Sequence, residues 1–361
     1  MLLYLFDYLS QYYSGFNVFQ YLTLRIILAA LTALFTSLIL GPYIIQKLKD
    51  ANMYQSVRDD GPESHINTKS NTPSMGGLII IISITISSIL WGDIYNRNIW
   101  ILLFILISFG IIGLYDDYKK FVLSSSDGIS GRSKLLLQII FSSIVLAFIF
   151  LNVENDLEIT LILPFIKTFS LYLGWLFIPW SIFIIVGSSN AVNLTDGLDG
   201  LAILPCILIA AAFVVFAYVE GNMSMAKYLL IPHLPNVSEI AIFASAIVGS
   251  GLGFLWYNCY PAEIFMGDVG SLSLGAILGT MAVLLRQEIA FAIMSGVFVV
   301  EVLSVIIQVA SFKLRGKRVF KMAPIHHHFE EKGWKETKII VRFWIITFIL
   351  VLVALSSLKI R

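Results

Sequence analysis

The sequence predicts an all-α, polytopic integral membrane protein with about ten transmembrane helices. Hydrophobic residues make up 58% of the 361 positions, whereas charged residues make up only 13%. A soluble domain of this length would need far more charge on its surface. Apolar runs of about 20 residues recur along the chain, and each is long enough to cross a bilayer as a helix. We therefore expect one transmembrane domain over residues 1–361.

The apolar runs define the expected spans. They lie near residues 21–46, 75–92, 98–115, 133–151, 170–188, 198–219, 238–256, 269–286, 289–312 and 339–358. Residues 1–20 include Tyr12 and Tyr13 and have a composition typical of a segment at the membrane interface. No basic region precedes the first span, so we expect no cleavable signal peptide. The two cysteines, Cys206 and Cys259, predict no disulfide framework.

Lysine and arginine residues concentrate in the loops that follow odd-numbered spans. These loops hold Lys47, Lys49, Arg58, Lys69, Lys119, Lys120, Arg132, Lys134 and the basic residues from Lys313 to Lys338. Because basic loops stay on the cytoplasmic side, we expect these loops in the cytoplasm and both termini outside. The ionisable motifs described below fall in the same loops, so the chemistry is expected at the cytoplasmic face. The net charge of +1 gives no indication of a nucleic-acid partner.

Asp116, Asp117 and Lys120 close the third span. If the helix continues past residue 115, Lys120 lies one turn beyond both carboxylates. Adjacent carboxylates beside a cation suit divalent-metal or phosphate binding. An ion pair at a solvated helix end would give the same pattern.

The segment Asn190–Gly200 places two aspartates and two asparagines between long apolar runs. We expect it to form a loop before the sixth span, whose N-terminus would favour an anion. A helix N-cap and a flexible turn would explain one of Asp196 and Asp199. The second aspartate, together with Asn190 and Asn193, favours a binding function.

Asp268 opens the eighth span within the segment Phe265–Gly270. It either caps that helix or ligates a metal ion together with the other carboxylates on this side. Hard oxygen ligands favour Mg²⁺, whereas zinc would favour cysteine or histidine. The two interpretations remain open from this segment alone.

His326, His327 and His328 are three of the five histidines in the chain. Successive side chains on a helix point about 100° apart, so the three rings do not all face one ion. Imidazole can bind phosphate, stack on a base or transfer a proton near neutral pH. An incidental polar loop would also explain these residues.

Polar residues also interrupt the ninth span and follow it. Glu301 and Gln308 are seven residues apart and share one helix face, which is typical of a site or an interhelical contact. The basic run Lys313–Lys321 favours contact with anionic lipid at the cytoplasmic surface. It also favours a break in the ninth span near Ser311–Lys321.

Four motifs in this order resemble those of the polyprenyl-phosphate N-acetylhexosamine-1-phosphate transferases. They are Asp116-Asp117-x-x-Lys120, Asn190–Gly200, Phe265–Gly270 and the loop that contains His326–His328. The resemblance covers essentially the whole chain. Arg58–His65, Thr72–Gly77 and Met322–His328 are similar to the members that transfer phospho-N-acetylmuramoyl-pentapeptide. Ser74 stands where those members commonly have threonine.

The resemblance implies that phospho-N-acetylmuramoyl-pentapeptide passes from UDP to undecaprenyl phosphate, which gives lipid I and UMP in the presence of Mg²⁺. It implies a multi-pass enzyme of peptidoglycan synthesis in the bacterial inner membrane, with a homodimer as a further expectation. Asp268 would ligate Mg²⁺, and Asp116, Asp117, Lys120 and His326 would act in catalysis. The implied substrate contacts are Lys69, Ser74, Lys134, Asn190, Asn193, Asp196, Asp199, Asn258, Phe265, Gln308 and His327.

The sequence leaves several alternatives open. The lipid phosphate attacks directly, with Asp117 organising charge or acting as base, or Asp268 attacks first and forms a phospho-enzyme. Since a phosphate monoester is mostly dianionic at neutral pH, a dedicated base adds little, and direct attack is favoured. A relative that uses UDP-N-acetylglucosamine is the alternative enzyme, and a transporter or flippase is the alternative class. The third residue of the stem peptide is not predicted.

Overall fold

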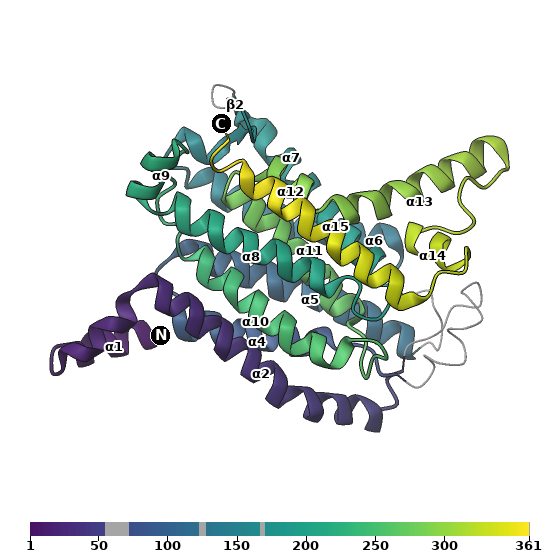
Figure 1. Cartoon of the computed structure of the whole chain (residues 1–361), viewed down its shortest axis with the longest axis horizontal. Helices are drawn as coiled ribbons and strands as arrows, with labels where there is room; N and C mark the ends of the chain where they lie inside the picture. Colours follow the sequence, from purple (N-terminus) through teal and green to yellow (C-terminus); the bar gives the residue numbers. More distant parts are fainter. Residues whose placement is uncertain (55–71, 123–127, 167–169, 361) are drawn as a thin grey trace.

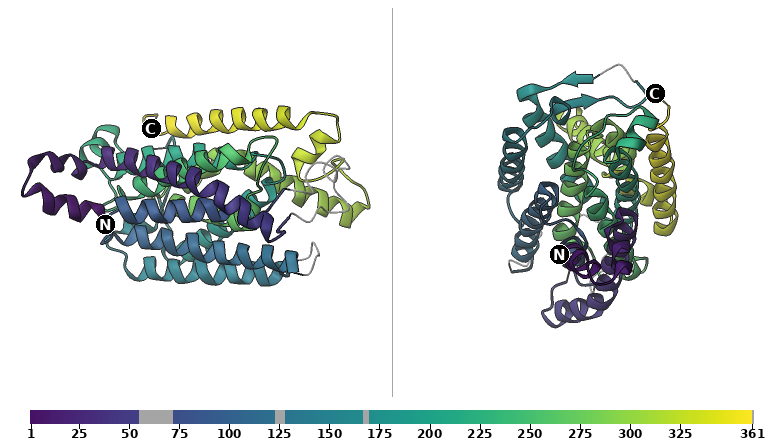
Figure 2. Two further views of the ribbon diagram at one scale, coloured as in Figure 1. Left: turned by 90° about the horizontal axis from the view of Figure 1, so that it is seen from below. Right: turned by 90° about the vertical axis from the view of Figure 1, so that its left-hand side faces the viewer.

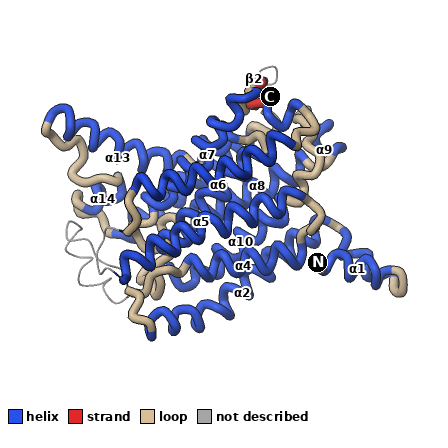
Figure 3. The backbone as a smooth tube through the Cα atoms, turned by 180° about the vertical axis from the view of Figure 1, so that it is seen from behind, coloured by secondary structure: helices blue, strands red, loops and turns tan. Residues whose placement is uncertain are grey.

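The protein is described by a computed structural model that covers residues 1–360 apart from 55–71, 123–127 and 167–169. Its long helices run roughly side by side in one bundle (Figures 1 and 2). Within the described ranges, the strands form one antiparallel hairpin, β1 (Thr160–Ile162) with β2 (Ser170–Tyr172), at one end of the bundle (Figure 3). The other described elements are all helices, so the predicted all-α class is confirmed.

Nine helices of the described chain are long and apolar enough to cross a membrane. They are α2 (Leu22–Asp50), α5 (Arg97–Val122), α6 (Gly131–Leu151), α7 (Phe177–Thr195), α8 (Ile203–Glu220), α10 (Ile240–Asn258), α11 (Gly267–Leu284), α13 (Gly296–Arg315) and α15 (Glu336–Ser356). A tenth apolar helix, α4 (Gly77–Trp91), has 15 residues and packs against α2, α10 and α11. These ten helices correspond to the ten predicted spans.

Shorter elements connect or flank these helices. They are α1 (Leu2–Ser10), η1 (Ser14–Gln20), η2 (Asp156–Ile159), η3 (Gly174–Leu176), α9 (Met223–Leu229), α12 (Glu288–Met294) and α14 (Ile325–Glu330). The chain ends lie together at one end of the bundle, as an even number of spans requires (Figure 2). At the same end, α1 and η1 project from the start of α2, and the Phe6 ring stacks on the Phe19 ring 4.0 Å away.

The central helix of the bundle is α11, which packs against α5 and α7. Glycines permit the close approach of these backbones. A Cβ atom on Gly113 of α5 would lie 2.3 Å from the carbonyl oxygen of Asp268, and one on Gly275 would lie 2.4 Å from that of Ser188. Real Cβ atoms do not approach other atoms so closely. The end of α5 and the start of α11 therefore meet, which places their acidic residues together.

The prediction that Asn190–Gly200 is a loop before the sixth span is partly wrong. Asn190 and Asn193 belong to the last two turns of α7, and only Asp196 to Ala202 form a connection. The following helix begins at Ile203, and its N-cap, Ala202, makes no side-chain capping bond. Neither Asp196 nor Asp199 caps α8. The apolar residues of α7 continue around the two asparagines, so the helix persists until the Asp196–Gly200 turn.

The predicted ninth span is two helices. Helix α12 ends at Met294, Ser295 interrupts the chain, and α13 begins at Gly296. The interruption therefore lies well before Ser311–Lys321, where the basic run favoured it. Helix α13 continues to Arg315 and ends where Gly316 adopts a φ of +65°. Its far end projects away from the other helices (Figures 1 and 3).

Candidate active site

Three carboxylates from two helices meet at the end of the bundle opposite the chain termini. Asp116 and Asp117 lie near the C-terminal end of α5, and Asp268 lies in the first turn of α11. Each offers an oxygen atom such that the three oxygens lie within 4.8 Å of one another. The Asp268 side chain is 13% exposed, whereas those of Asp116 and Asp117 are 2% and 8% exposed. Asp268 is therefore the most accessible member of this carboxylate cluster.

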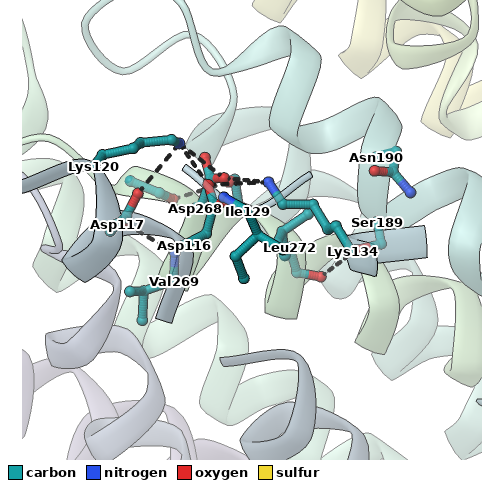
Figure 4. Close-up of polar contacts among 12 residues, drawn as sticks. Asp116, Asp117, Lys120, Ile129, Lys134, Ser189, Asn190, Asp268, Val269 and Leu272 are labelled. Atoms are coloured by element: carbon teal, nitrogen blue, oxygen red, sulfur yellow. Dashed lines mark hydrogen bonds and ion pairs between the residues drawn. The ribbon is translucent and has the colours of Figure 1, made fainter. Parts of the chain in front are cut away.

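Two lysines reach the carboxylate cluster from different helices (Figure 4). The Nζ atom of Lys120, on α5, lies 2.6 Å from Asp116 Oδ2 and 3.1 Å from Asp268 Oδ2. The Nζ atom of Lys134, on α6, lies 3.2 Å and 2.5 Å from the same two oxygens. The predicted pairing of Lys120 with Asp116 is confirmed because α5 continues to Val122. The lysines offset most of the negative charge that three adjacent carboxylates would otherwise carry.

Backbone amides fix the orientation of the two α5 carboxylates. The amide of Ile129 donates to Asp116 Oδ1 over 2.7 Å, and the amide of Val269 donates to Asp117 Oδ2 over 3.3 Å. Gly267, just before Asp268, has a φ of +70°, and a Cβ atom there would lie 2.6 Å from Asp117 Oδ2. The sequence indicated glycines beside Asp268, but no pattern in it indicated the Ile129 contact. Asp268 lies inside α11, whose N-cap is Met266, so the alternative that Asp268 caps this helix is wrong.

The chain before α4 lies alongside the loop that leads into α11. The amide of Gly76 donates to the carbonyl of Phe265 over 2.8 Å, and the amide of Phe265 donates to the carbonyl of Pro73 over 2.9 Å. These bonds bring Ser74 to the cluster, since its Oγ would lie 3.0 Å from a Cβ atom on Gly267. The structure thus places Ser74 and the backbone of Phe265 beside the carboxylate cluster, and their contact with substrate stays a prediction. Lys69 lies outside the described residues.

The turn after α7 is held by hydrogen bonds to its neighbours. Asp199 Oδ2 accepts from the amide of Ala262 over 3.0 Å, and the amide of Asp199 donates to Glu336 Oε1 over 3.0 Å. Asn258 Oδ1 accepts from the amide of Gly200 over 3.1 Å, and its Nδ2 donates to the carbonyl of Ile264 over 2.8 Å. Asp199 and Asn258 therefore hold the turn after α7 against the segment between α10 and α11, and these two segments form the wall of the site. No sequence pattern indicated the part played by Glu336.

Two further expected substrate contacts, Asn190 and Asn193, lie on α7. Asn190 donates to Gln138 Oε1 and to the carbonyl of Val186, each over 2.8 Å, and it lies apart from the carboxylate cluster (Figure 4). Asn193 lies on the last turn of α7 and is partly exposed, close in sequence to Asp196, which ends that helix.

Gln308 lies on α13 and hydrogen-bonds to the backbone of the loop that follows this helix. Its Oε1 accepts from the amides of Val319 and Phe320 over 3.0 and 2.9 Å, and its Nε2 donates to the carbonyl of Phe320. These bonds fold the chain after α13 back onto that helix. Gln308 therefore anchors the segment that leads to the histidines.

The three histidines have three different environments, as their helical spacing predicted. His326 is buried, and its Nδ1 lies 3.1 Å from Glu301 Oε2. His327 Nδ1 lies 2.6 Å from Glu330 Oε2, and the His327 side chain is 16% exposed. His328 Nδ1 accepts from the amide of Lys321 over 3.0 Å. Burial and two nearby lysines lower the pKa of His328 below its usual value.

The donor set of the carboxylate cluster fits a hard divalent cation. Three carboxylate oxygens lie within 4.8 Å of one another, and the Asp268 side chain keeps some exposed surface. Magnesium accepts one or two protein carboxylates and fills its remaining positions with water and substrate phosphate. The lysine ammonium groups contact the oxygens that such an ion would share. Cation binding would thus displace or rearrange at least one lysine.

Comparison with known protein families agrees with this geometry. The pattern of glycosyl transferase family 4 matches residues 99–286, which include all three carboxylates. The first signature of phospho-N-acetylmuramoyl-pentapeptide-transferase matches residues 69–81, where Ser74 lies. The protein is thus a transferase of a phosphosugar to a polyprenyl phosphate in peptidoglycan synthesis. The chain belongs to the phospho-N-acetylmuramoyl-pentapeptide-transferase family.

Proposed function

We propose that the protein transfers phospho-N-acetylmuramoyl-pentapeptide from UDP to undecaprenyl phosphate and releases UMP. The observation that carries this proposal is the cluster of Asp116, Asp117 and Asp268 with Lys120 and Lys134 at one end of a membrane-length bundle. A phosphoryl transfer mainly needs positioning and charge neutralisation, and this cluster supplies both signs of charge. A lipid phosphate in the bilayer surface and a soluble nucleotide can both reach that end.

Magnesium is the cofactor we assign to the carboxylate cluster. Asp268 is the leading ligand because its side chain is more exposed than those of Asp116 and Asp117. When bound, the ion would withdraw negative charge from the pyrophosphate of the nucleotide. Lys120 and Lys134 would then turn toward the phosphate oxygens and balance the charge that develops during transfer.

Direct attack by the lipid phosphate is the mechanism we favour. An oxygen of undecaprenyl phosphate bonds to the β-phosphorus of the nucleotide sugar, and the bond to the UMP oxygen breaks. We assign Asp117 to orienting charge, since it is nearly buried and already accepts a hydrogen bond from Val269. The lipid phosphate needs no base because it is mostly dianionic at neutral pH. Trapping a phosphorylated aspartate with the UDP-substrate alone would contradict this route.

The uridine nucleotide is proposed to lie against the turn after α7. Asn193 and Asp196 border that turn. The partly exposed His327 ring lies 4.1 Å from the His326 ring, which packs on the turn. Ser74, beside Gly267, is proposed to meet the phosphates, and Lys69 stays a predicted contact of the nucleotide. Asp199, Asn258 and Gln308 would contribute by holding the walls in place.

The cluster is proposed to face the cytoplasm of a bacterium, from the inner membrane. The basic loops follow the odd-numbered spans, and basic loops stay cytoplasmic. Nucleotide-activated sugars are made in the cytoplasm, so the donor would meet the carboxylate cluster without crossing the bilayer.

The test uses the purified protein with undecaprenyl phosphate, Mg²⁺ and one UDP-sugar at a time. We expect UMP release with UDP-N-acetylmuramoyl-pentapeptide, none with UDP-N-acetylglucosamine, and none after chelation of the metal. Release only with UDP-N-acetylglucosamine would favour the related enzyme. Absence of UMP with both donors would overturn the proposed reaction and favour a transport function.

A further inference from the structure

The first of the three consecutive histidines is enclosed in protein. His326 lies in the first turn of α14 and has no exposed surface, whereas the neighbouring His327 and His328 are partly exposed. A ring that solvent does not reach cannot touch a nucleotide in this arrangement. Its chemistry must therefore be directed at other protein groups.

One edge of the His326 ring faces Glu301. The Nδ1 atom lies 3.1 Å from Glu301 Oε2, and both side chains are buried. Among the described residues, neither oxygen of the Glu301 carboxylate and neither ring nitrogen of His326 makes a hydrogen bond, so their 3.1 Å approach is an ion-pair contact. An isolated carboxylate within a membrane-spanning helix is costly, and pairing with imidazole offsets part of that cost. This contact connects α13, which projects from the bundle, to α14.

The opposite edge of the ring presses on the turn after α7. A Cβ atom on Gly197 would lie 2.5 Å from His326 Nε2, so the ring packs directly on the glycine backbone. Gly197 lies between Asp196 and Asp199, the two aspartates of that turn. Any movement of the ring would displace the turn that we assign to the nucleotide.

An apolar cluster includes sequence neighbours of both residues and of Gly197. Leu198 and Leu201 of the turn pack with Val297 of α13 and with three residues of α15 (Ile339, Ile340 and Phe343), and Ile325 and Phe329 of α14 lie against them. The ring and the carboxylate are thus a polar link beside a packed joint between α13, α14, α15 and the turn. Loss of the link would leave these apolar contacts in place and would remove the polar contact that holds α14 to α13.

We propose that Glu301 and His326 form a buried positioning pair that sets the turn Asp196–Asp199 and α14 in their working arrangement. His326 acts through Gly197 and touches neither substrate, while His327 is the histidine that faces ligand. This inference rests on the proposed function for its kinetic readout, and it replaces the expectation that His326 acts directly in catalysis. Glu301 and His326 then operate as one unit.

The test is a double-mutant cycle with Glu301→Ala, His326→Ala and the double variant, followed by UMP release. We expect each single change to lower kcat/KM by about 10-fold or more, and the double variant to fall no further than the worse single. The KM for the nucleotide should carry part of the loss, because the turn is displaced. The shape of the pH profile of kcat/KM should stay unchanged. Ser304→Ala, a buried change on the same helix, is the matched control.

A direct catalytic role for His326 gives a different pattern. Glu301→Ala would then stay near the activity of the unsubstituted protein, His326→Ala would lose far more, or one limb of the pH profile would disappear. Any of these results would overturn the proposal.

The contact between His326 and Gly197 allows a second test of the proposal. Gly197→Ala should lower activity alone and add little in the His326→Ala background, because the ring that it crowds is gone.

A failure of a variant to fold, and a failure of the proposed function, can each be distinguished from a failure of the proposed pair. If the alanine variants do not purify, Glu301→Gln and His326→Asn keep hydrogen-bonding groups and should lose less activity, with the same non-additivity. If the unsubstituted protein releases no UMP, the proposed function fails, yet the pair is still tested by thermal unfolding. Additive shifts in Tm for the two single changes would then overturn the pair.

Discussion

The Nζ atom of Lys134 lies 2.5 Å from Oδ2 of Asp268, although 134 residues separate the two in the sequence. The same oxygen lies 3.1 Å from Nζ of Lys120. Asp268 thus already holds two cationic partners at the position where a divalent ion would bind. The lysines neutralise the carboxylates, and they also compete with a metal for them.

Lys134→Met separates these two effects. We expect kcat to fall by about 10²-fold, because one cation that balances transition-state charge is lost. The Mg²⁺ concentration that gives half-maximal activity should nevertheless decrease, since a competing ammonium group has been removed. UMP release measured over a series of Mg²⁺ concentrations checks both. Lys119→Met, at a partly exposed position on α5, is the control. An unchanged or higher Mg²⁺ requirement in Lys134→Met would refute the competition.

Gly267→Ala should damage the site through sterics. The residue has a φ of +70°, and its Cβ atom would lie 2.6 Å from Asp117 Oδ2. Gly316→Ala is a matched control, because Gly316 has a φ of +65° and a Cβ atom there would meet no other atom within 4 Å. Both changes carry the backbone cost of about 1 kcal/mol for a left-handed alanine. Only Gly267→Ala is expected to abolish most UMP release. Equal losses in the two variants would show that the backbone, and not Asp117, is responsible.

Asn258→Ala should act on stability more than on catalysis. The side chain accepts from the amide of Gly200 and donates to the carbonyl of Ile264, and it is 2% exposed. Its loss leaves two buried backbone groups unpaired, at a cost of about 1–3 kcal/mol each. Thermal unfolding should show a clearly lower Tm, while kcat at a permissive temperature changes little. A large rise in the nucleotide KM without a change in Tm would instead assign Asn258 to direct substrate contact.

The features that the sequence predicted well depend on local geometry. The ten spans follow from runs of apolar residues, and Lys120 meets Asp116 because positions four apart on a helix are neighbours. The contact between Lys134 and Asp268 depends on how α6 and α11 pack. No local pattern encodes that packing. Charge patterns could only indicate that both residues belong to the same membrane face.

The less accurate predictions concern helix ends and interruptions. Asn190 and Asn193 were expected in a loop because asparagine favours turns, yet their apolar neighbours keep α7 helical to Thr195. Ser295 interrupts the ninth span within a run of high hydropathy. Ser295 and Gly296 are only two small residues in that run, so they barely change its hydropathy pattern. The burial of His326 was also not predictable, because the partner, Glu301, lies 25 residues earlier on another helix.

The pair of Arg25 and Glu239 gives a prediction for the end of the bundle opposite the carboxylate cluster. Arg25 donates to both carboxylate oxygens of Glu239 over 3.0 and 2.8 Å, and the two side chains are only 8% and 9% exposed. Glu239→Ala strands the guanidinium in a buried position, so the free energy of unfolding should fall by about 3–5 kcal/mol. Replacing both residues with Met should cost less than the single change, since no buried charge then remains. UMP release at a permissive temperature should be unaffected in both variants, because neither residue contacts the site. Thermal unfolding measures the stability of each variant, and the UMP assay measures its activity. A double variant less stable than Glu239→Ala would show that the unpaired guanidinium is not the cause of the loss.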